Sequence, residues 1–156
     1  MIRIEIPGRA APLEIAHVAL DYNGTVAVDG RVLESVRARL PELLKRAKVH
    51  VLTADTYGTV RAQCEPLGVE VHAFPRAGAG NCKKEIVAGL RGGVACFGNG
   101  FNDIPMFGLA DLSVAVLEGE GLCAAVLPHA DVLAATAADA LDLLLKPDRL
   151  RATLRN

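Results

Sequence analysis

The chain has no apolar stretch long enough to cross a bilayer, no long run of one charge and no internal repeat. A membrane-spanning helix needs about 20 mostly apolar residues. The longest candidate, Leu122 to Leu145, is interrupted by Pro128, His129, Asp131 and Asp139. The formal net charge of −1 over 156 residues argues against nucleic acid and against a charged membrane surface as partners. We therefore expect neither partner.

Cysteine and histidine are few and scattered. The four cysteines are Cys64, Cys82, Cys96 and Cys123. No two of them have the CxxC spacing, so we expect reduced thiols. The first residues also lack the long apolar core of a secretory leader, which favours a cytoplasmic protein. The four histidines are His17, His50, His72 and His129. Because they are equally scattered, the sequence predicts no zinc site and assigns them surface or structural roles.

What is present is an alternation of short β-branched runs with segments of helical spacing. Apolar residues make up 51% of the chain, enough for a sizeable core. Runs such as "HVAL", "KVHVLT", "VACFG" and "LSVAV" are typical of buried parallel strands. Helices are expected at 33–46, 57–67, 82–90, 104–109, 121–127 and 137–146. The pattern predicts one domain over residues 1–156, a three-layer α/β/α Rossmann-like fold with a parallel central sheet.

Two local signals refine this prediction. The dipeptide Asp29-Gly30 lies between alternating residues, which predicts a small β-hairpin. Pro147-Asp148 follows the last expected helix, and we expect a loose tail over residues 147–156.

Polar residues gather where the expected strands end. Asp21 follows "HVAL", Thr53 follows "VHVL", and the loop 98–103 follows "VACF". Ligands of parallel α/β sheets bind at these carboxyl ends. A carboxylate can attack phosphorus, glycine amides can hold phosphate oxygens, and hydroxyl and ammonium groups can stabilise the developing charge. The strand ends therefore favour phosphoryl chemistry.

Two neighbouring lysines compete for the cationic role. In a helix, Lys83 shares one face with Ile86, Val87 and Leu90, at i, i+3, i+4 and i+7. If that face packs on the sheet, Lys83 points towards the strand ends and Lys84 points outward.

The segments "DYNGT", "LTADT", "NCKKEIVAGL" and "GNGFNDIPMF" resemble, in this order, the four motifs of the haloacid dehalogenase (HAD) superfamily. The resemblance covers residues 18–116 and is greatest to soluble P-type-ATPase-like phosphorylation domains. It implies a hydrolase of the phosphatase or ATPase type that uses Mg²⁺ and forms an aspartyl-phosphate. The spacing between motifs leaves little room for a cap domain. Capless members are often covered by a neighbouring subunit, which allows a homo-oligomer. We expect a small phosphorylated substrate as the partner, although a capless site could also accept a large or macromolecular one.

The resemblance also implies roles for individual residues. Asp21 would be the nucleophile, with Asn23, Thr53 and Lys83 as the other catalytic residues. The phosphate would be bound by Asn23, Gly24, Thr53, Ala54 and Lys83. Mg²⁺ would be held by Asp21, Asn23, Asn99 and Asp103, with Thr25 and Asn102 in support. Asp55 would be auxiliary.

Each of these residues also has a simple structural interpretation. Asp21 could cap a turn, Asn23-Gly24 could form a plain hairpin turn, and Thr53 could cap a helix. Lys83 could be a solvated lysine. The loop 98–103 could be a glycine-rich turn closed by an aspartate.

Two positions depart from the family pattern, because Asn23 and Asn99 stand where aspartates are usual. An amide cannot exchange the proton that the aspartate at position 23 would, and such general acid–base help is worth about 10²–10⁴ in rate. We therefore expect slow turnover of simple monoesters. Two alternatives stay open: a nearly inactive protein that binds a phosphorylated ligand or a partner, and metal-independent carbon–halogen cleavage.

Overall fold

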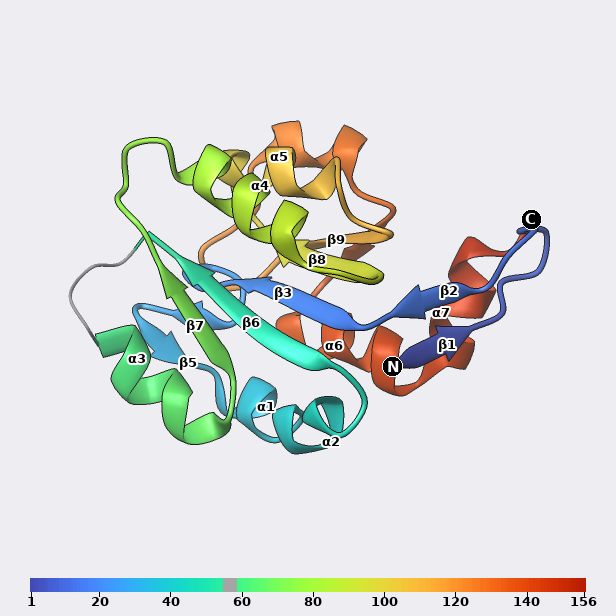
Figure 1. Ribbon diagram of the computed structural model, residues 1–156, viewed down its shortest axis with the longest axis horizontal. Helices are drawn as coiled ribbons and strands as arrows, with labels where there is room; N and C mark the ends of the chain where they lie inside the picture. Colours follow the sequence, from blue (N-terminus) through green and yellow to red (C-terminus); the bar gives the residue numbers. More distant parts are fainter. Residues whose placement is uncertain (55–58) are drawn as a thin grey trace.

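The computed structural model describes residues 1–54 and 59–156. At its centre lies a six-stranded sheet with the strand order β10-β9-β8-β3-β6-β7, in which all neighbouring strands are parallel (Figure 1). The strands are β3 (His17–Asp21), β6 (Lys48–Thr53), β7 (Glu70–Ala73), β8 (Val94–Gly98), β9 (Leu112–Val116) and β10 (Val132–Ala134). The central strands are buried along almost their whole length, as expected for a parallel sheet covered on both faces.

Helices cover both faces of this sheet (Figure 1). On one face lie α1 (Glu34–Arg37), α2 (Leu40–Leu44), α3 (Thr59–Cys64) and α6 (Ala137–Leu145). On the other lie α4 (Ala79–Gly89) and α5 (Ile104–Phe107). Each side has its own apolar cluster, one around Val18, Leu20 and Leu141, the other around Ala19, Leu52 and Val87. The predicted three-layer α/β/α architecture is confirmed.

The predicted hairpin is also present. Strands β4 (Ala27–Val28) and β5 (Arg31–Val32) pair in antiparallel fashion. Asp29 and Gly30 join them with φ angles of 51° and 74°. Two consecutive positive φ angles are what a tight type I′ turn requires. Within residues 1–54 and 59–156 this flap is the only insertion between β3 and β6 besides the short helices α1 and α2.

β1 (Ile2–Ile4) and β2 (Leu13–Ile15) pair only with each other, outside the main sheet. Two expectations need correction. The helix expected over 33–46 is split into α1 and α2, because Pro41 cannot continue a helix through its interior but suits the first turn of a new one.

The second correction concerns the expected loose tail, which is helix α7 (Pro147–Leu154). Pro147 occupies the first turn, Asp148 is favourable there because of the helix dipole, and Leu150 is buried. Short 3-10 segments complete the chain: η1 (Glu65–Leu67), η2 (Phe101–Asp103) and η3 (Ala124–His129).

The direction in which successive strands are added to the sheet reverses at one point. The chain runs from β3 outward through β6 to β7, and then returns to β8 on the other side of β3. The carboxyl ends of β3 and β8 therefore flank the topological switch, where parallel α/β sheets bind ligands.

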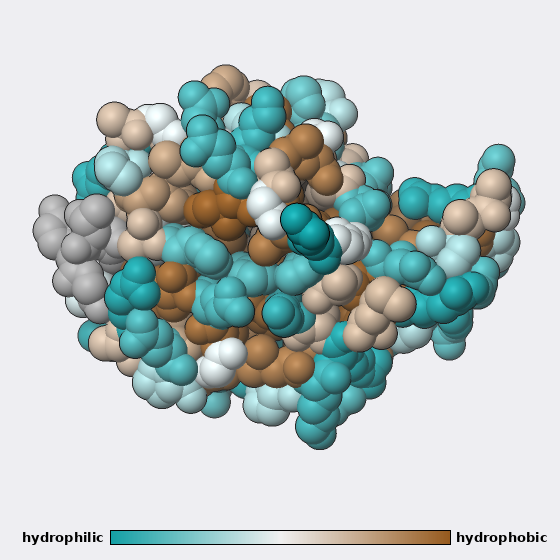
Figure 2. Space-filling view, viewed as in Figure 1, coloured by the Kyte–Doolittle hydropathy of each residue, from teal (hydrophilic) through white to brown (hydrophobic). Residues whose placement is uncertain are grey.

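The surface is mixed in character. On the face shown in Figure 2, hydrophobic and hydrophilic residues are interspersed, and the projecting end built from β1, β2 and α7 is mainly hydrophilic. In the described part of the chain, helices are all too short or too polar to traverse a lipid bilayer. All four cysteines are free thiols.

Candidate active site

A pocket of about 240 Å³ lies at the carboxyl ends of β3, β6 and β8. Its lining residues are Asp21, Asn23, Thr53, Ala54, Lys83, Asn99, Gly100 and Asn102. All of these except Gly100 are individually predicted from the sequence, and Gly100 lies inside the predicted loop 98–103. Segments far apart in the chain thus meet at the switch point of the sheet.

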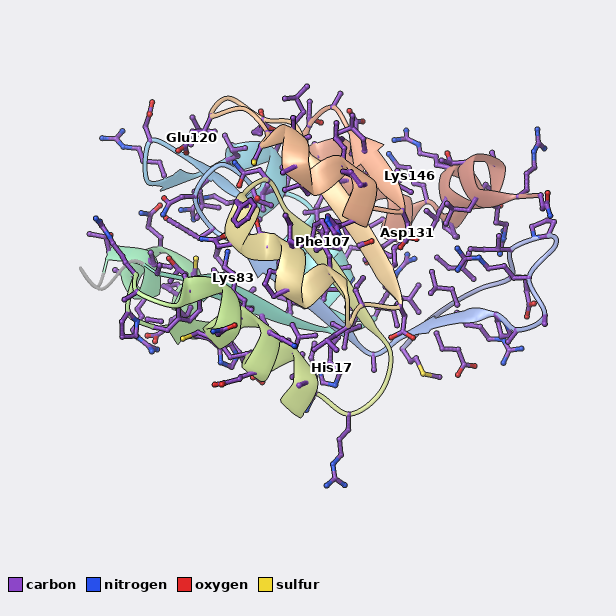
Figure 3. The ribbon with its side chains drawn as sticks, turned by 90° about the horizontal axis from the view of Figure 1, so that it is seen from above. His17, Lys83, Phe107, Glu120, Asp131 and Lys146 are labelled. Carbon is purple, nitrogen blue, oxygen red and sulfur yellow. The ribbon has the colours of Figure 1, made fainter. Side chains whose placement is uncertain are left out.

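The centre of the pocket is a buried ammonium group between two carboxylates. Lys83 Nζ lies 2.6 Å from Asp21 Oδ1 and 2.6 Å from Asp103 Oδ1. It also donates to Asn102 Oδ1 at 2.9 Å. The side chain of Lys83 is only 1% exposed. Figure 3 shows Lys83 on α4, and the neighbouring Lys84 is exposed. The structure therefore places Lys83, and not Lys84, at the strand ends.

The electrostatics of this trio reflect competition between burial and charge. Burial opposes the charged form of Lys83, but the charges of Asp21 and Asp103 outweigh it and raise the lysine pKa. Burial, aided by the Asp21 charge and opposed by Lys83, raises the pKa of Asp103 to about 7. Lys83 is consequently held in its cationic form, the form that binds phosphate oxygens.

Asp103 lies behind the pocket wall. It is fully buried and absent from the pocket lining. Its Oδ1 accepts from Lys83, and its Oδ2 accepts the backbone N–H groups of Asn99 and Gly100 at 3.0 and 2.9 Å. Asp103 thus fixes Lys83 and the glycine loop from behind the pocket wall, and metal binding by Asp103 stays a prediction.

Gly98 is required by this arrangement. A Cβ atom at position 98 would lie 2.4 Å from Asp103 Cγ and Oδ2. Any larger residue at the end of β8 would therefore displace the carboxylate that holds the loop.

The hydroxyl group of Thr25 connects Asn99 to Asp21. Thr25 Oγ1 lies 3.1 Å from Asp21 Oδ2 and 3.3 Å from Asn99 Oδ1. The amide nitrogen of Asn99 donates to the carbonyl of Gly121 at 3.0 Å, which fixes the orientation of its oxygen towards Thr25. Gly121 is a contributor that no motif in the sequence indicates.

The turn after Asp21 offers fewer free backbone amides for phosphate binding than the sequence suggests. The N–H of Gly24 donates to Ala27 at 2.8 Å, and the N–H of Thr25 donates to Tyr22 at 3.3 Å. These two amides are engaged within the loop, and neither Gly24 nor Thr25 lines the pocket. Phosphate binding by Gly24 therefore stays a prediction, while Asn23 does line the pocket.

The opposite wall comes from the end of β6. Thr53 is buried, its neighbour Ala54 is partly exposed, and both line the pocket. Asp55, for which an auxiliary role is expected, and Tyr57, the expected start of a helix, lie outside the described residues.

The donor set fits a hard cation such as Mg²⁺. Asp21 Oδ2 and Asn99 Oδ1 are bridged by a single hydroxyl, which can donate to only one of them at a time. One carboxylate and neutral oxygens, with water and phosphate as further ligands, are the usual surroundings of Mg²⁺. Asp21, Asn99 and the backbone of Asn23 are the pocket residues that could hold the ion.

A second, larger pocket of about 480 Å³ adjoins the first, since Asn102 lines both. Its walls include Phe101, whose side chain is 70% exposed, and Pro105. Apolar groups of a ligand could pack there while its polar end occupies the smaller pocket.

Several solved structures with the same fold are named as phosphatases or hydrolases. The cobalt-bound form of deoxy-D-mannose-octulosonate 8-phosphate phosphatase (YrbI) from Haemophilus influenzae aligns with a TM-score of 0.71 at 17% identity, over 91% of this chain and 94% of that one. A structure from Streptomyces avermitilis MA-4680, described as a HAD family hydrolase, aligns with a TM-score of 0.64 at 24% identity, over 86% and 87% of the chains.

A zinc-transporting PIB-type ATPase aligns with a TM-score of 0.63 at 25% identity, over 78% of this chain and 20% of that one. The fold is therefore that of the HAD superfamily, as the four motifs predict, and it is consistent with a domain without a cap.

Two archaeal proteins are similar in sequence. Uncharacterized protein MJ0072 of Methanocaldococcus jannaschii is 49% identical over 39 residues, which are 25% of this chain and 89% of that protein. Uncharacterized protein MJ0073 of the same organism is 38% identical over 63 residues, 40% of this chain and 68% of that protein. The chain belongs to the family of these two proteins. No protein-family model matches it.

Proposed function

We propose that the chain is a single-domain, Mg²⁺-dependent phosphohydrolase that transfers a phosphoryl group to Asp21 and then to water. The observation that carries this proposal is the contact of Lys83 with Asp21 and Asp103 at the wall of a pocket. This contact sets the carboxylate of Asp21 beside a fixed positive charge at the switch point of a HAD fold, which supports its proposed role as the nucleophile.

The proposed reaction has two displacements at phosphorus. An Asp21 oxygen forms a bond to phosphorus while the bond to the leaving-group oxygen breaks, and that oxygen departs with the bonding electrons. Water then attacks the acyl phosphate, which restores the carboxylate and releases inorganic phosphate. Lys83 and Thr53 line the pocket, and in this proposal their ammonium and hydroxyl groups bind the equatorial oxygens, whose charge grows in the transition state.

Proton transfer is the weak part of this site. Asn23 lines the pocket where a general acid would act, but its amide cannot give a proton to the leaving group. The leaving group must therefore be stable without protonation, as in acyl phosphates, aryl phosphates and nucleoside di- or triphosphates. Simple alkyl monoesters should be poor substrates.

Bound Mg²⁺ would neutralise phosphate charge and align the phosphoryl group with Asp21. Asp21, Asn99 and the Asn23 backbone would hold it. Since Asn99 brings no charge, the affinity for the free ion should be low, and the phosphate of the substrate should raise it.

The larger pocket at Phe101 and Pro105 would bind the leaving group. Small phosphorylated compounds with an aromatic or apolar part fit this description best. Of the proteins that share the fold, one is named for a sugar phosphate and one is an ATPase, so both substrate types belong in a screen.

The test is a screen of phosphorylated compounds with and without Mg²⁺, run on the wild type, Asp21→Asn and Asp29→Asn. Asp29 lies in the exposed hairpin turn and serves as the matched control. We expect Mg²⁺-dependent phosphate release by the wild type and by Asp29→Asn but none by Asp21→Asn. Unchanged release by Asp21→Asn would refute the proposal.

The two asparagines favour one second candidate, a protein that binds a phosphorylated ligand with little turnover. Both Asn23 and Asn99 line the pocket, so the charge is reduced there without loss of hydrogen-bonding capacity. This candidate predicts that the wild type binds phosphate or a phosphorylated compound but releases nothing in the screen.

A further inference from the structure

We propose that His50, Glu70 and His72 form a second metal site, specific for a borderline ion such as Zn²⁺ and independent of the proposed active site. Two imidazoles and one carboxylate are a donor set that suits zinc. The three residues lie at the outer edge of the sheet, on β6 and β7, whereas the pocket of Asp21 lies at the carboxyl ends of β3, β6 and β8.

Strand pairing creates this cluster from residues scattered along the sequence. In the parallel pair β6–β7, His50 lies opposite Glu70 and Leu52 lies opposite His72. Side chains two residues apart on a strand share one face of a sheet. Glu70 and His72 therefore flank His50 on the same face, so histidines that are scattered in the sequence lie together in the fold.

The donor atoms converge at distances typical of a metal site. His50 Nδ1 lies 3.1 Å from His72 Nε2 and 3.2 Å from Glu70 Oε2. His72 Nε2 and Glu70 Oε2 are 4.0 Å apart. Two ligands of a tetrahedral zinc ion with bonds of 2.0–2.1 Å lie about 3.3–3.4 Å apart. Shifts of a few tenths of an ångström in exposed side chains would close the site.

A chain of hydrogen bonds fixes which nitrogen of His50 is free. His17 Nε2 lies 3.1 Å from the carbonyl of Arg91, which can only accept, so this nitrogen carries the proton. Neutral His17 then accepts at Nδ1, which lies 3.0 Å from His50 Nε2. His50 Nε2 is therefore the donor, and its Nδ1 presents a lone pair to Glu70 and His72.

That lone pair faces a carboxylate oxygen at 3.2 Å with no proton between them. If His72 Nε2 carries a proton, it can donate that proton to His50 Nδ1 at 3.1 Å. Glu70 Oε2 lies 4.0 Å from His72 Nε2, too far for a hydrogen bond, so it would have no hydrogen bond from either imidazole. One cation at the centre of the three atoms would satisfy all of them.

The surroundings match those of known metal-binding histidines. Such a histidine usually donates its other N–H to a neighbour that fixes its tautomer, and His17 has this position next to His50. In Figure 3, Lys83 lies on α4, whereas His17, which belongs to β3, lies beyond one end of that helix and away from Lys83. His50 is buried, while the side chains of Glu70 and His72 are 61% and 32% exposed. An ion can thus enter from solvent and keep a water as its fourth ligand.

The site would connect the edge strand β7 to its neighbour β6. Among the described residues, this is the one group of three or more histidine, cysteine or acidic side chains whose ligand atoms lie within bonding range of one ion. The inference does not depend on the proposed phosphohydrolase activity.

The test is binding of Zn²⁺ by calorimetry and of Co²⁺ by its visible absorption, on the full chain with Mg²⁺ in excess to occupy the oxygen site. We compare the wild type with His72→Gln and with His129→Gln, which changes the exposed histidine of η3. We expect one ion per chain, with the intense bands of tetrahedral Co²⁺, in the wild type and in His129→Gln. His72→Gln should lose more than about 100-fold in affinity.

Three more variants make the result decisive. Glu70→Gln changes an exposed side chain, so the variant should fold, and it should lose affinity as His72→Gln does. His17→Gln removes no ligand but should weaken binding about 10–100-fold. Asp21→Asn should bind as the wild type does. Equal binding by wild type, His72→Gln and Glu70→Gln, loss of binding in Asp21→Asn, or no Zn²⁺ binding by the wild type would each overturn the proposal.

Discussion

At the scale of single residues, one ammonium group determines how the site is assembled. Lys83 is buried and contacts Asp21 on one side and Asp103 on the other. Two carboxylates that both contact one ammonium group would repel each other strongly if that cation were absent. Lys83 therefore has a structural role in holding the pair together as well as the proposed role in binding phosphate.

Replacement of this lysine should cost both stability and activity. Lys83→Met leaves two buried carboxylates without their partner, and breaking a buried ion pair from one side costs about 3–5 kcal/mol. Urea denaturation should show this loss, and phosphate release should fall below detection. Lys84→Met, which changes the exposed neighbour, should alter neither. Equal stability of the two variants would contradict the assigned position of Lys83.

Asn23 offers a gain-of-function test. Asn23→Asp would restore a group that can protonate the leaving oxygen and later activate water, and we expect turnover of simple monoesters to rise by about 10²–10⁴. Steady-state phosphate release from an alkyl and an aryl phosphate measures the effect. The gain should be larger for the alkyl ester, whose leaving group needs the proton more. An equal or absent gain would count against the assigned role of position 23.

The sequence predicted these residues because the rule that identifies them is local. Asp21, Thr53 and the loop 98–103 each follow an apolar run, and parallel strands bring such ends to one edge. Lys83 follows from helical spacing, and the family pattern of a lysine four residues before a valine and seven before a leucine selects it too. The burial of Asp103 behind the pocket and the contact of Gly121 with Asn99 depend on how loops pack, which no local pattern encodes.

At the scale of elements, the turn after β3 and the loop after β8 fit together closely. Gly24 has a φ of 79°, and a Cβ atom there would lie 2.2 Å from Asn99 Nδ2. Gly30, in the nearby hairpin, has a φ of 74° and no neighbour within 4 Å of such an atom. The two glycines thus share a left-handed backbone geometry, which glycine adopts without strain, but differ in their contacts.

This difference defines a matched pair of variants. Gly24→Ala and Gly30→Ala should both lose about 1–2 kcal/mol of folding stability from the left-handed backbone. Only Gly24→Ala should displace Asn99, and we expect it to weaken Mg²⁺-dependent activity about 10–100-fold. A titration of activity against Mg²⁺ concentration separates them. Identical titrations would contradict a metal-binding role for Asn99.

Helix α6 is tied to its neighbours through one aspartate. Asp142 accepts from Arg39 at 2.9 and 3.1 Å and from Lys146 at 2.9 Å. The hydrogen bonds from Arg39, which outweigh burial, lower the pKa of Asp142 below its ordinary value of 3.8. A carboxyl whose pKa is lower in the folded state stabilises above its unfolded pKa and loses this effect as pH falls through the folded value.

Asp142→Asn should therefore lower stability by about 1–3 kcal/mol near neutral pH. The difference from the wild type should shrink as pH falls below about 5. Thermal unfolding at a series of pH values checks both statements, with Asp29→Asn in the exposed hairpin turn as the control. A difference that stays constant down to the most acidic pH would show that Asp142 does not act through its charge.

Several elements could not be predicted because their signals compete. Pro41 lies within a helical pattern and splits it, whereas Pro147 starts a helix where a tail was expected. Both positions follow the preference of proline for a first turn. The histidine cluster depends on the register between β6 and β7, which a pattern within one strand cannot reveal.

At the scale of the whole molecule, the order of the strands makes these contacts possible. β3 lies in the middle of the sheet, with β6 on one side and β8 on the other, so three strand ends converge on one pocket (Figure 1). Among the described residues, the elements between β3 and β6 are the short hairpin β4–β5 and the helices α1 and α2, which is consistent with a domain without a cap. An open pocket of this kind would admit substrates with large leaving groups, in keeping with the adjoining cavity at Phe101.

The most direct measurement is to identify the phosphorylated residue. The wild type and Asp21→Asn are mixed with an activated phosphoryl donor and Mg²⁺, quenched in acid and examined by mass spectrometry of the intact chain and of its peptides. We predict one added phosphoryl group in the wild type, located at Asp21 and removed by hydroxylamine, and none in the variant. Turnover without a phosphorylated Asp21, or a phosphoryl group on another residue, would contradict the account.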